Sequence, residues 1–304
     1  KHSICYRLIL SIMTFKEWHT TGQYFDYRQQ KIFYQQAGSG PVLVLLHGFP
    51  TASWDWHKVW PSLAEHYTLL APDFVGFGWS DKPRKYHYSL MDQADLVEAL
   101  LKEKGIRNYH LLAHDYGATV AQELLARHYE RIAEGKVADD AHLSSLCFLN
   151  GGIFPGTHHP RPIQNALASP LGILLTPFLS KTKLRKNFSA IFGPATQATE
   201  QEVDEFYQLI QHNNGKYLFH RLIRYMRERE VHEDRWVGAT VRGELPQRFI
   251  NGVYDPISGG HVADYYEQTV NNADVVRLPE IGHYPQTEAP AAVVEAYLAF
   301  RGGF

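Results

Sequence analysis

Ala113-His114-Asp115-Tyr116-Gly117 is the stretch of sequence that decides the fold. A short apolar run ending at Leu112 precedes it, and a stretch with helical spacing, Ala118–Arg127, follows it. A strand, a sharp turn between small residues and a helix form the context in which a nucleophile elbow presents a reactive side chain. The side chain at this bend is Asp115, where Ser is more usual, and the chemistry expected of the chain follows from that change.

Apolar runs typical of strands alternate along the chain with stretches of helical spacing. Strands are expected at 23–29, 31–36, 41–46, 67–72, 109–112, 143–149, 248–255 and 274–278, and helices at 53–65, 89–104, 118–127, 163–180, 200–213, 215–230, 261–270 and 289–302. Strands that alternate with helices indicate a mostly parallel sheet with right-handed crossovers. Residues 153–240 contain no strand-like run, so we expect a helical insertion that covers the carboxyl ends of the strands.

The expected domains are an N-terminal extension at 1–22, a core at 23–152 and 241–304, and a helical cap at 153–240. The apolar stretch 4–13 is short and is interrupted by Arg7. It is either an extension upstream of a natural start at Met13 or a weak leader or interfacial segment.

The composition excludes several classes of function. Of the 304 residues 44% are hydrophobic and 20% charged, and the net charge of −2 gives no basic field for nucleic acid or an acidic membrane surface. The 17 histidines show no metal-ligand spacing, and Cys5 and Cys147 suggest no disulfide framework. We expect a cytoplasmic monomer or homodimer without stable membrane insertion, with no metal and no cofactor, and with Cys147 as a buried free thiol.

Three residues with catalytic potential each follow a predicted strand, in the order Asp115, Asp255 and His283. That order, and four motifs, resemble the α/β-hydrolase superfamily in its epoxide hydrolase and haloalkane dehalogenase branch. The motifs are His47-Gly48-Phe49-Pro50, Gly76-Phe77-Gly78-Trp79-Ser80-Asp81-Lys82-Pro83, His114-Asp115-Tyr116-Gly117 and Gly282-His283-Tyr284-Pro285-Gln286.

Within that branch, Leu46-His47-Gly48-Phe49-Pro50-Thr51 and Asn150-Gly151-Gly152-Ile153-Phe154-Pro155 resemble the subgroup of mesoderm-specific transcript proteins and their bacterial relatives. The resemblance covers roughly residues 23–303. It implies an α/β-hydrolase fold, with a mostly parallel eight-stranded sheet, helices on both faces and an inserted helical cap.

The resemblance also implies a mechanism. A carboxylate can attack a saturated carbon without first losing a proton, so Asp115 would form an alkyl ester with the substrate. His283, oriented by Asp255, would then activate water to hydrolyse that ester. The backbone N–H groups of Phe49 and Tyr116 would form the oxyanion hole.

Structural interpretations of these residues stay open at this point. Asp115 is also suited to be only the N-cap of the helix that follows it, and Asp255 is also suited to a turn before Pro256. The other position for the acid holds Asn150, which cannot act as a carboxylate, and this favours Asp255. His47 and His114 are expected to support loops rather than to take part in catalysis.

The leaving group distinguishes the possible substrates. Dehalogenases of this branch typically hold the halide with side-chain N–H groups at the positions of Phe49 and Tyr116, and Phe49 offers none. The form His47-Gly48-Phe49-Pro50 resembles epoxide hydrolases and implies a cis bond before Pro50. Epoxide hydrolases use two cap tyrosines as donors to the ring oxygen. Tyr225 matches one of them; 153–206 contains no Tyr, and Tyr207 or Tyr217 would have to replace the other.

Three hypotheses follow. The first is epoxide hydrolysis to a diol by an ether-bond hydrolase. The second is dehalogenation or other hydrolysis through an Asp nucleophile, and the third is a non-catalytic binding module on the same fold. Several aromatic residues of the predicted cap suggest either an apolar pocket wall for a small apolar electrophile or packing within the cap: Phe154, Phe178, Phe188, Phe192 and Trp236.

Overall fold

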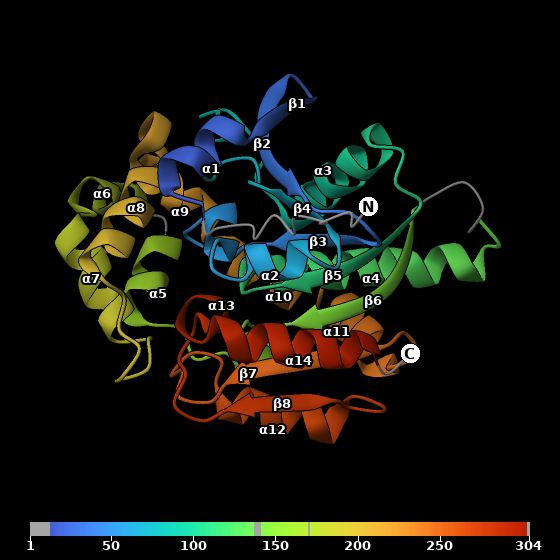
Figure 1. The fold of residues 1–304 in the computed structure, drawn as a ribbon. Coiled ribbons are helices and arrows are strands. Elements are labelled where there is room, and N and C mark those ends of the chain that lie inside the picture. The colour runs from blue at the N-terminus through green and yellow to red at the C-terminus, as the bar shows by residue number, and fades with distance from the viewer. Residues whose placement is uncertain (1–12, 137–140, 170, 303–304) are drawn as a thin grey trace, which may run out of the picture.

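An eight-stranded sheet lies at the centre of the computed structural model, which describes residues 13–136, 141–169 and 171–302 (Figure 1). Its spatial order is β1-β2-β4-β3-β5-β6-β7-β8, and only the pairings β1–β2 and β2–β4 are antiparallel. The strands are β1 (Gln23–Tyr27), β2 (Gln30–Ala37), β3 (Val42–Leu46), β4 (Thr68–Pro72), β5 (Asn108–Ala113), β6 (His142–Phe148), β7 (Gln247–Gly252) and β8 (Val275–Leu278). The predicted fold class, a mostly parallel sheet within an α/β fold, is confirmed.

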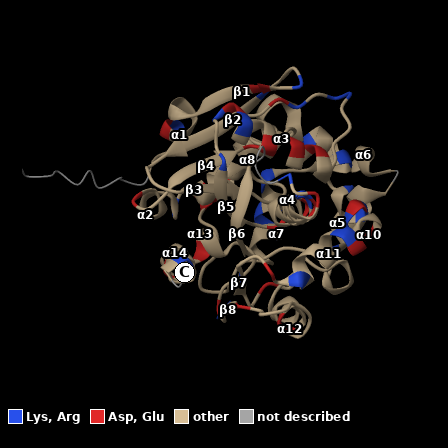
Figure 2. Ribbon diagram, turned by 90° about the vertical axis from the view of Figure 1, so that its right-hand side faces the viewer, with Lys and Arg blue, Asp and Glu red and all other residues tan. Residues whose placement is uncertain are grey.

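Helices cover both faces of the sheet, as Figure 2 shows. One face carries α3 (Leu90–Glu103), α4 (Tyr116–Ala133), α11 (Glu233–Arg242) and α12 (Gly260–Thr269). The other carries α1 (Phe15–Thr21), η1 (Ser53–Trp56), α2 (Trp60–Ala64) and α14 (Pro290–Gly302), with α13 (Pro285–Glu288) just before α14.

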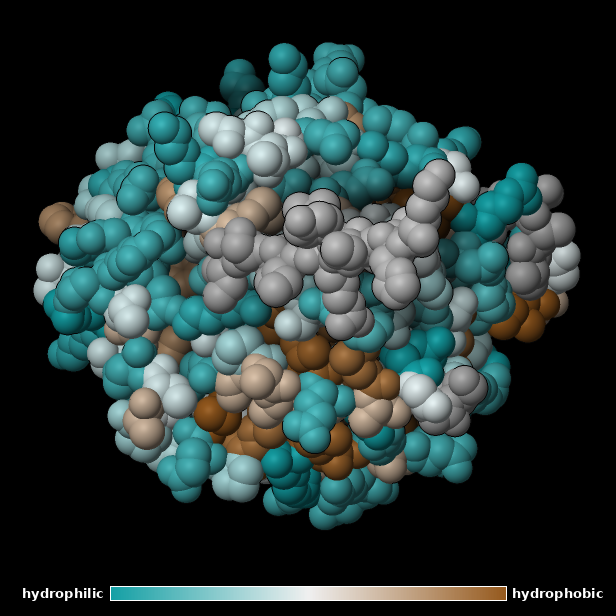
Figure 3. Space-filling view, viewed as in Figure 1, coloured by the Kyte–Doolittle hydropathy of each residue, from teal (hydrophilic) through white to brown (hydrophobic). Residues whose placement is uncertain are grey.

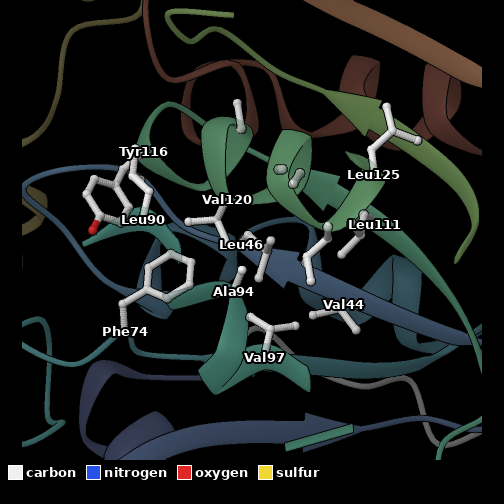
Figure 4. Packing of buried hydrophobic residues seen from close by; sticks show 14 of the residues in the cluster. Val44, Leu46, Phe74, Leu90, Ala94, Val97, Leu111, Tyr116, Val120 and Leu125 are labelled. Carbon is white, nitrogen blue, oxygen red and sulfur yellow. The ribbon is translucent and has the colours of Figure 1, made fainter. Parts of the chain in front are cut away.

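Alternate residues of the central strands supply the two cores. Val44 and Leu46 of β3 lie in the core under α3 and α4, whereas Leu43 and Leu45 lie in the core on the opposite face. Figure 4 shows the first core, where Val97 of α3 and Val120 of α4 pack near the side chains of β3. Because successive side chains of a strand point to opposite faces, a continuous apolar run is what a strand covered on both faces requires.

The segment between β6 and β7 is helical. It contains η2 (Pro155–Thr157), α5 (Pro162–Ala168), α6 (Gly172–Leu175), η3 (Thr176–Phe178), α7 (Lys181–Ser189), α8 (Glu200–Gln211), η4 (His212–Leu218), α9 (Phe219–Leu222) and α10 (Tyr225–Val231), and then α11. Among the described residues of 153–240 there is no strand, as predicted. The expected boundary at 240 falls inside α11, which packs against α4 of the core.

Three predicted helices are broken in the structure. The helix expected at 53–65 is a 3₁₀ turn followed by α2, which begins at Trp60 with a proline in its first turn. The helix expected at 163–180 is divided into α5, α6 and η3, because Gly172 packs against the carbonyl of Leu167 and Pro177 begins a new turn. The third, 215–230, is divided among η4, α9 and α10, and η4 contains the left-handed residues Asn213 and Asn214 just before the expected start.

Two further differences lie near the N-terminus. The β1–β2 turn is at Arg28-Gln29, where both φ angles are positive, and so lies inside the strand expected at 23–29. Residues 15–21, expected to be part of an extension, form α1, whose Trp18 is fully buried with its ring 4.7 Å from that of Trp60. Residues 1–12, with Cys5 and the possible leader, lie outside the described residues.

Candidate active site

Asp115 lies at a sharp bend between β5 and α4. Its φ of 46° and ψ of −105° are a strained combination for a residue with a side chain. The bend is tight because Gly117 lies against β3, where a Cβ would be 2.4 Å from the carbonyl oxygen of Leu46. The side chain of Asp115 makes no capping hydrogen bond to α4, so the N-cap interpretation of this residue is wrong.

The structure brings Asp115, Asp255 and His283 together, although 168 residues separate the first from the last. The Nδ1 of His283 lies 2.6 Å from Oδ2 of Asp255, and its Nε2 lies 3.6 Å from Oδ2 of Asp115. The loops after β7 and β8 approach closely at Gly252, where a Cβ would be 2.0 Å from the carbonyl oxygen of Gly282. All three side chains are at least 95% buried.

Asp255 is held by four donors besides the histidine. Its Oδ1 accepts the N–H of Ile257, and its Oδ2 accepts the N–H and hydroxyl of Ser258 and the amide of Asn150. Asn150 also accepts the N–H of Gly252. The sequence identified Asn150 only as a position that lacks an acid; in the structure it fixes the acid that is present.

The other oxygen of Asp115 meets a backbone donor. The N–H of Phe49 donates to Oδ1 over 2.9 Å. The N–H of Tyr116, the first residue of α4, has no acceptor within its own helix. The peptide bond between Phe49 and Pro50 is cis, as the motif implies.

The protonation of the three groups follows from their mutual charges. Burial alone would raise the pKa of Asp115, but the hydrogen bond to His283 and the charge of that residue lower it. The same balance lowers the pKa of Asp255 to about 2. Burial alone would lower the pKa of His283, yet the charges of the two carboxylates and their hydrogen bonds raise it to about 10. The unreacted site therefore holds two carboxylates and an imidazolium.

A largely apolar cavity opens onto this site. Asp115 and His283 form its floor, together with Phe49 and Tyr284, and its walls come mainly from the helical insertion: Ile163, Leu167, Leu179, Leu184, Phe188, Ile191, Tyr207, Ile210 and Phe219. Polar side chains at the wall include Arg161, Gln164, Lys183 and Asn187. A substrate with a substantial apolar part fits such walls.

Of the five aromatic residues proposed for the pocket wall, only Phe188 lines the cavity. Phe154 and Trp236 are buried in the core around α4, and Phe192 is buried beside Phe188. Phe178 is 65% exposed. The alternative interpretation, packing, is therefore correct for Phe154, Phe192 and Trp236.

The candidate tyrosines differ in position. Tyr225 is 2% exposed, its ring lies 6.0 Å from that of Phe49 and 5.0 Å from that of Tyr116, and its hydroxyl has no hydrogen-bond partner among the described residues. Tyr207 lines the cavity and accepts a hydrogen bond from Gln211. Tyr217 lies in a different surface hollow. Burial and the charge of Asp115 raise the pKa of Tyr225, which keeps its hydroxyl protonated.

Arg229 is a residue of this site that the sequence analysis missed. It is 3% exposed, and it donates to the hydroxyl of Thr119 over 2.7 Å and to the backbone carbonyl of Asp115 over 3.2 Å. Its guanidinium lies 4.5 Å from the centre of the Tyr225 ring. Tyr225 and Arg229 are four residues apart and so share one face of α10, a spacing that could have linked them.

His47 and His114 lie around the elbow without facing the cavity. His114 donates from Nε2 to the backbone carbonyl of His283, and His47 accepts the N–H of Phe74. Burial lowers the pKa of His47 to about 3 and that of His114 to about 4, so both are neutral. Their contacts match the expected support of loops.

Comparisons with known proteins agree with this architecture. A family model described as the alpha/beta hydrolase fold matches residues 41–290. The chain is 40% identical over 300 residues to the mesoderm-specific transcript protein of Mus musculus, covering 94% of this chain and 88% of that protein. It is 37% identical over 285 residues to the putative hydrolase LipZ of Mycobacterium tuberculosis, covering 93% and 96%.

Shorter matches and a solved structure show further similarities. Matches over about a third of the chain are 40% identical to a soluble epoxide hydrolase of Corynebacterium and 38% identical to a haloalkane dehalogenase of Mesorhizobium japonicum. The solved structure of the epoxide hydrolase CorEH superposes with a TM-score of 0.74 at 22% identity, covering 93% of this chain and 99% of that one.

Proposed function

The chain belongs to the alpha/beta hydrolase fold family, and from that premise we propose that it is a hydrolase that opens epoxides through an ester on Asp115. The observation that carries the proposal is the arrangement of the Asp115 carboxylate, with Oδ1 on the Phe49 N–H and Oδ2 facing His283 at the floor of an apolar cavity. An ionised carboxylate fixed in this way is a nucleophile for a saturated carbon.

The first step joins Oδ2 of Asp115 to a carbon of the epoxide. The bond between that carbon and the ring oxygen breaks, and its electron pair stays on the oxygen. A tyrosine hydroxyl then supplies a proton to this oxygen. Tyr225 is the donor that its motif and its protonated hydroxyl favour, although its side chain is not among those that line the cavity. Tyr207 is the candidate for a second donor because it lines the cavity.

The second step hydrolyses the ester. Water loses a proton to Nε2 of His283 and attacks Cγ of Asp115, and the negative charge that develops on Oδ1 faces the N–H of Phe49 and that of Tyr116. Collapse of this intermediate breaks the ester bond, and the departing alkoxide takes the proton held by His283 to complete the diol. The carboxylic acid left on Asp115 then returns its proton to His283, which restores the starting carboxylate and imidazolium. Each such backbone donor is typically worth about 3 kcal/mol of barrier.

Ester formation itself prepares His283 for the second step. In the unreacted protein, two carboxylates hold the pKa of His283 at about 10, so it is protonated and is not a base. Alkylation of Asp115 removes one of those charges. The pKa of His283 then falls, so the imidazolium gives up its proton, which restores the hydroxyl of the tyrosine that protonated the ring oxygen. The neutral ring can now accept the proton of water.

Dehalogenation is the second candidate. The relatives include a haloalkane dehalogenase, and the carboxylate would attack a halogenated carbon equally well. The phenyl side chain of Phe49 offers no donor to a leaving halide, which favours the epoxide.

The test uses the variant His283→Gln, in which water is no longer activated. With a small apolar epoxide such as styrene oxide, intact mass should rise by the mass of the epoxide, and a peptide map should place the addition on Asp115. The wild type should release diol from the same epoxide. The double variant Asp115→Asn, His283→Gln is the matched control and should gain no mass. Halide release from a chloroalkane without diol from any epoxide would replace the proposal with dehalogenation, and no adduct from either class would refute both.

A further inference from the structure

The charge of the chain is distributed unevenly along the sequence. The whole chain has 32 Asp and Glu against 30 Lys and Arg. From 141 to 199, however, there is no Asp or Glu, while the segment contains Arg161, Lys181, Lys183, Arg185 and Lys186. This stretch supplies α5 and α7, two of the helices that line the cavity. The segment is therefore net basic, although Glu200 and Asp204, just beyond it, pair with two of its cations.

Exposed apolar side chains gather in the same segment. Leu171, Ile173, Leu174 and Phe178, which we call the apolar ridge, are 67%, 53%, 62% and 65% exposed. They lie on or beside α6 and η3, and brown atoms reach the surface at the left edge of Figure 3, where Figure 1 places α6 and α7. Four such side chains within eight residues of sequence are unusual on a surface that faces only water.

Lysine and arginine side chains come directly after the apolar ridge in the sequence. Of the four in α7, Lys181 pairs with Asp204 and Arg185 with Glu200. The ammonium of Lys183 lies 5.8 Å from the centre of the Phe178 ring, next to the ridge. On the other side, Arg84 and Arg221 share a surface hollow with Ile173. Basic side chains thus flank the apolar ridge on two sides.

Residues that adjoin this surface also line the cavity. Leu179 and Ser180, which follow the ridge at once, and Lys183 line the cavity that leads to Asp115. Arg161 lines it as well. A molecule that enters the cavity past these residues comes from the side on which the ridge is exposed.

We propose that the apolar ridge and its flanking cations dock the protein on the surface of an anionic lipid bilayer. Apolar side chains that enter the interface, with lysine and arginine around them, are the combination by which peripheral proteins bind such surfaces. No helix among the described residues is long and apolar enough to cross a membrane. A second copy of the chain is a poorer occupant of a symmetric contact here, because two basic surfaces would face one another.

Docking would also bring the cavity to the substrate. An apolar molecule dissolved in the bilayer could pass along the ridge to Asp115 without crossing water. This last consequence rests on the proposed function, whereas the docking does not.

The docking is tested with the full chain and sedimented vesicles of phosphatidylcholine, with and without roughly a third of phosphatidylserine. We expect binding only to the anionic vesicles, and weaker binding at high salt. The pair Leu174→Asn, Phe178→Asn should weaken the binding about tenfold or more. Lys186→Glu should weaken it severalfold.

Matched controls come from the opposite end of the molecule. Ile132→Asn replaces an apolar side chain that is 48% exposed near the end of α4, and Lys102→Glu reverses an exposed charge on α3. Both should bind as the wild type does. All substituted side chains are exposed, so thermal unfolding should be unchanged and a folding defect would be seen separately.

Three results would overturn the proposal. They are equal binding to both kinds of vesicle, unchanged binding of the ridge variants, and a wild-type dimer that the ridge variants convert to monomer. The last would identify the ridge as a contact between copies. The ester test on Asp115 uses styrene oxide in solution without vesicles, so failure of the chemistry and failure of docking are distinguishable.

Discussion

Asp115 and His283 face one another with opposite charges across 3.6 Å, and this pair dominates the electrostatics of the site. The buried imidazolium is stable only because two carboxylates surround it. Removal of either carboxylate charge leaves a cation that burial disfavours, so the ring should lose its proton more readily.

The variant Asp115→Asn should therefore lower the pKa of His283 below its wild-type value of about 10. Asn keeps the shape of the side chain and removes only the charge, as an alkyl ester would. The pKa is measured from the imidazole resonances in an NMR titration of both proteins. An unchanged pKa would mean that Asp255 alone sets the protonation of His283, and that the ester does not prepare the base.

Arg229 offers a second test at the scale of one side chain. Its guanidinium satisfies the hydroxyl of Thr119 and the backbone carbonyl of Asp115 inside the protein. Arg229→Met keeps most of the apolar stem and removes both donors, which should cost about 3 kcal/mol of unfolding free energy or more. Arg229→Lys should lie between, because one ammonium cannot reproduce the planar fork.

The matched control is Arg227→Met, the same substitution at an exposed position of the same helix. It should change the free energy of unfolding in urea by no more than about 0.5 kcal/mol. Equal effects at the two positions would show that the contacts of Arg229 add little to stability.

From the sequence alone, those site residues could be identified whose residue type and surrounding motif place them at the end of a predicted strand. Asp115, Asp255 and His283 each follow a strand of a parallel sheet, so the fold itself brings them to one edge. The sequence could not identify Asn150 or Arg229. Asn150 contributes through a hydrogen bond to Gly252, which is 102 residues away in the sequence. Arg229 contributes through a hydrogen bond to the backbone of Asp115, which is 114 residues away. No local sequence pattern encodes such distant contacts.

At the scale of elements, the close packing of α4 against β3 makes the elbow possible. Gly117→Ala would place a methyl group 2.4 Å from the carbonyl oxygen of Leu46, in rigid backbone on both sides. The bend must open, so we expect loss of ester formation on Asp115 together with a destabilisation of about 2 kcal/mol or more.

Gly238→Ala is the control, because an added methyl group meets nothing within 4 Å on α11. There Ala should stabilise the protein by about 0.5–1 kcal/mol through helix propensity. Thermal unfolding and the adduct assay on each variant measure both effects. Normal adduct formation by Gly117→Ala would contradict the need for so tight a bend.

Strands and long helices could be predicted at this scale, whereas the short helices of the insertion could not. The runs at 41–46 and 67–72 are apolar throughout because both faces of each strand are covered, and the structure places β3 and β4 there. In the insertion, breaks at Gly172 and Asn213 depend on contacts and on left-handed backbone that apolar spacing does not reveal. Helix α7 was missed altogether, because its charged residues hide a single buried stripe of Leu184 and Phe188.

At the scale of the whole molecule, the three charges of the site link chemistry to folding. A group whose pKa differs between the folded and unfolded states makes stability depend on pH. The carboxylates have lowered pKa values, so their contribution is present above about pH 4 and is lost as the pH falls. His283 has a raised pKa, so its contribution is fully present below about pH 6.5 and is lost as the pH rises toward 10.

The last prediction compares unfolding of the wild type and of His283→Gln at two pH values. Near pH 6 the wild type should have the higher Tm by a clear margin, because its imidazolium pairs with two buried carboxylates that the Gln leaves without a cation. Near pH 9.5 the margin should shrink, since most of the stability linked to the raised pKa of His283 is then lost. Titrating groups away from the site are common to both proteins and cancel in the difference. A margin that is the same at both pH values would mean that His283 is neutral in the folded protein, and that the site begins its cycle without an ion pair.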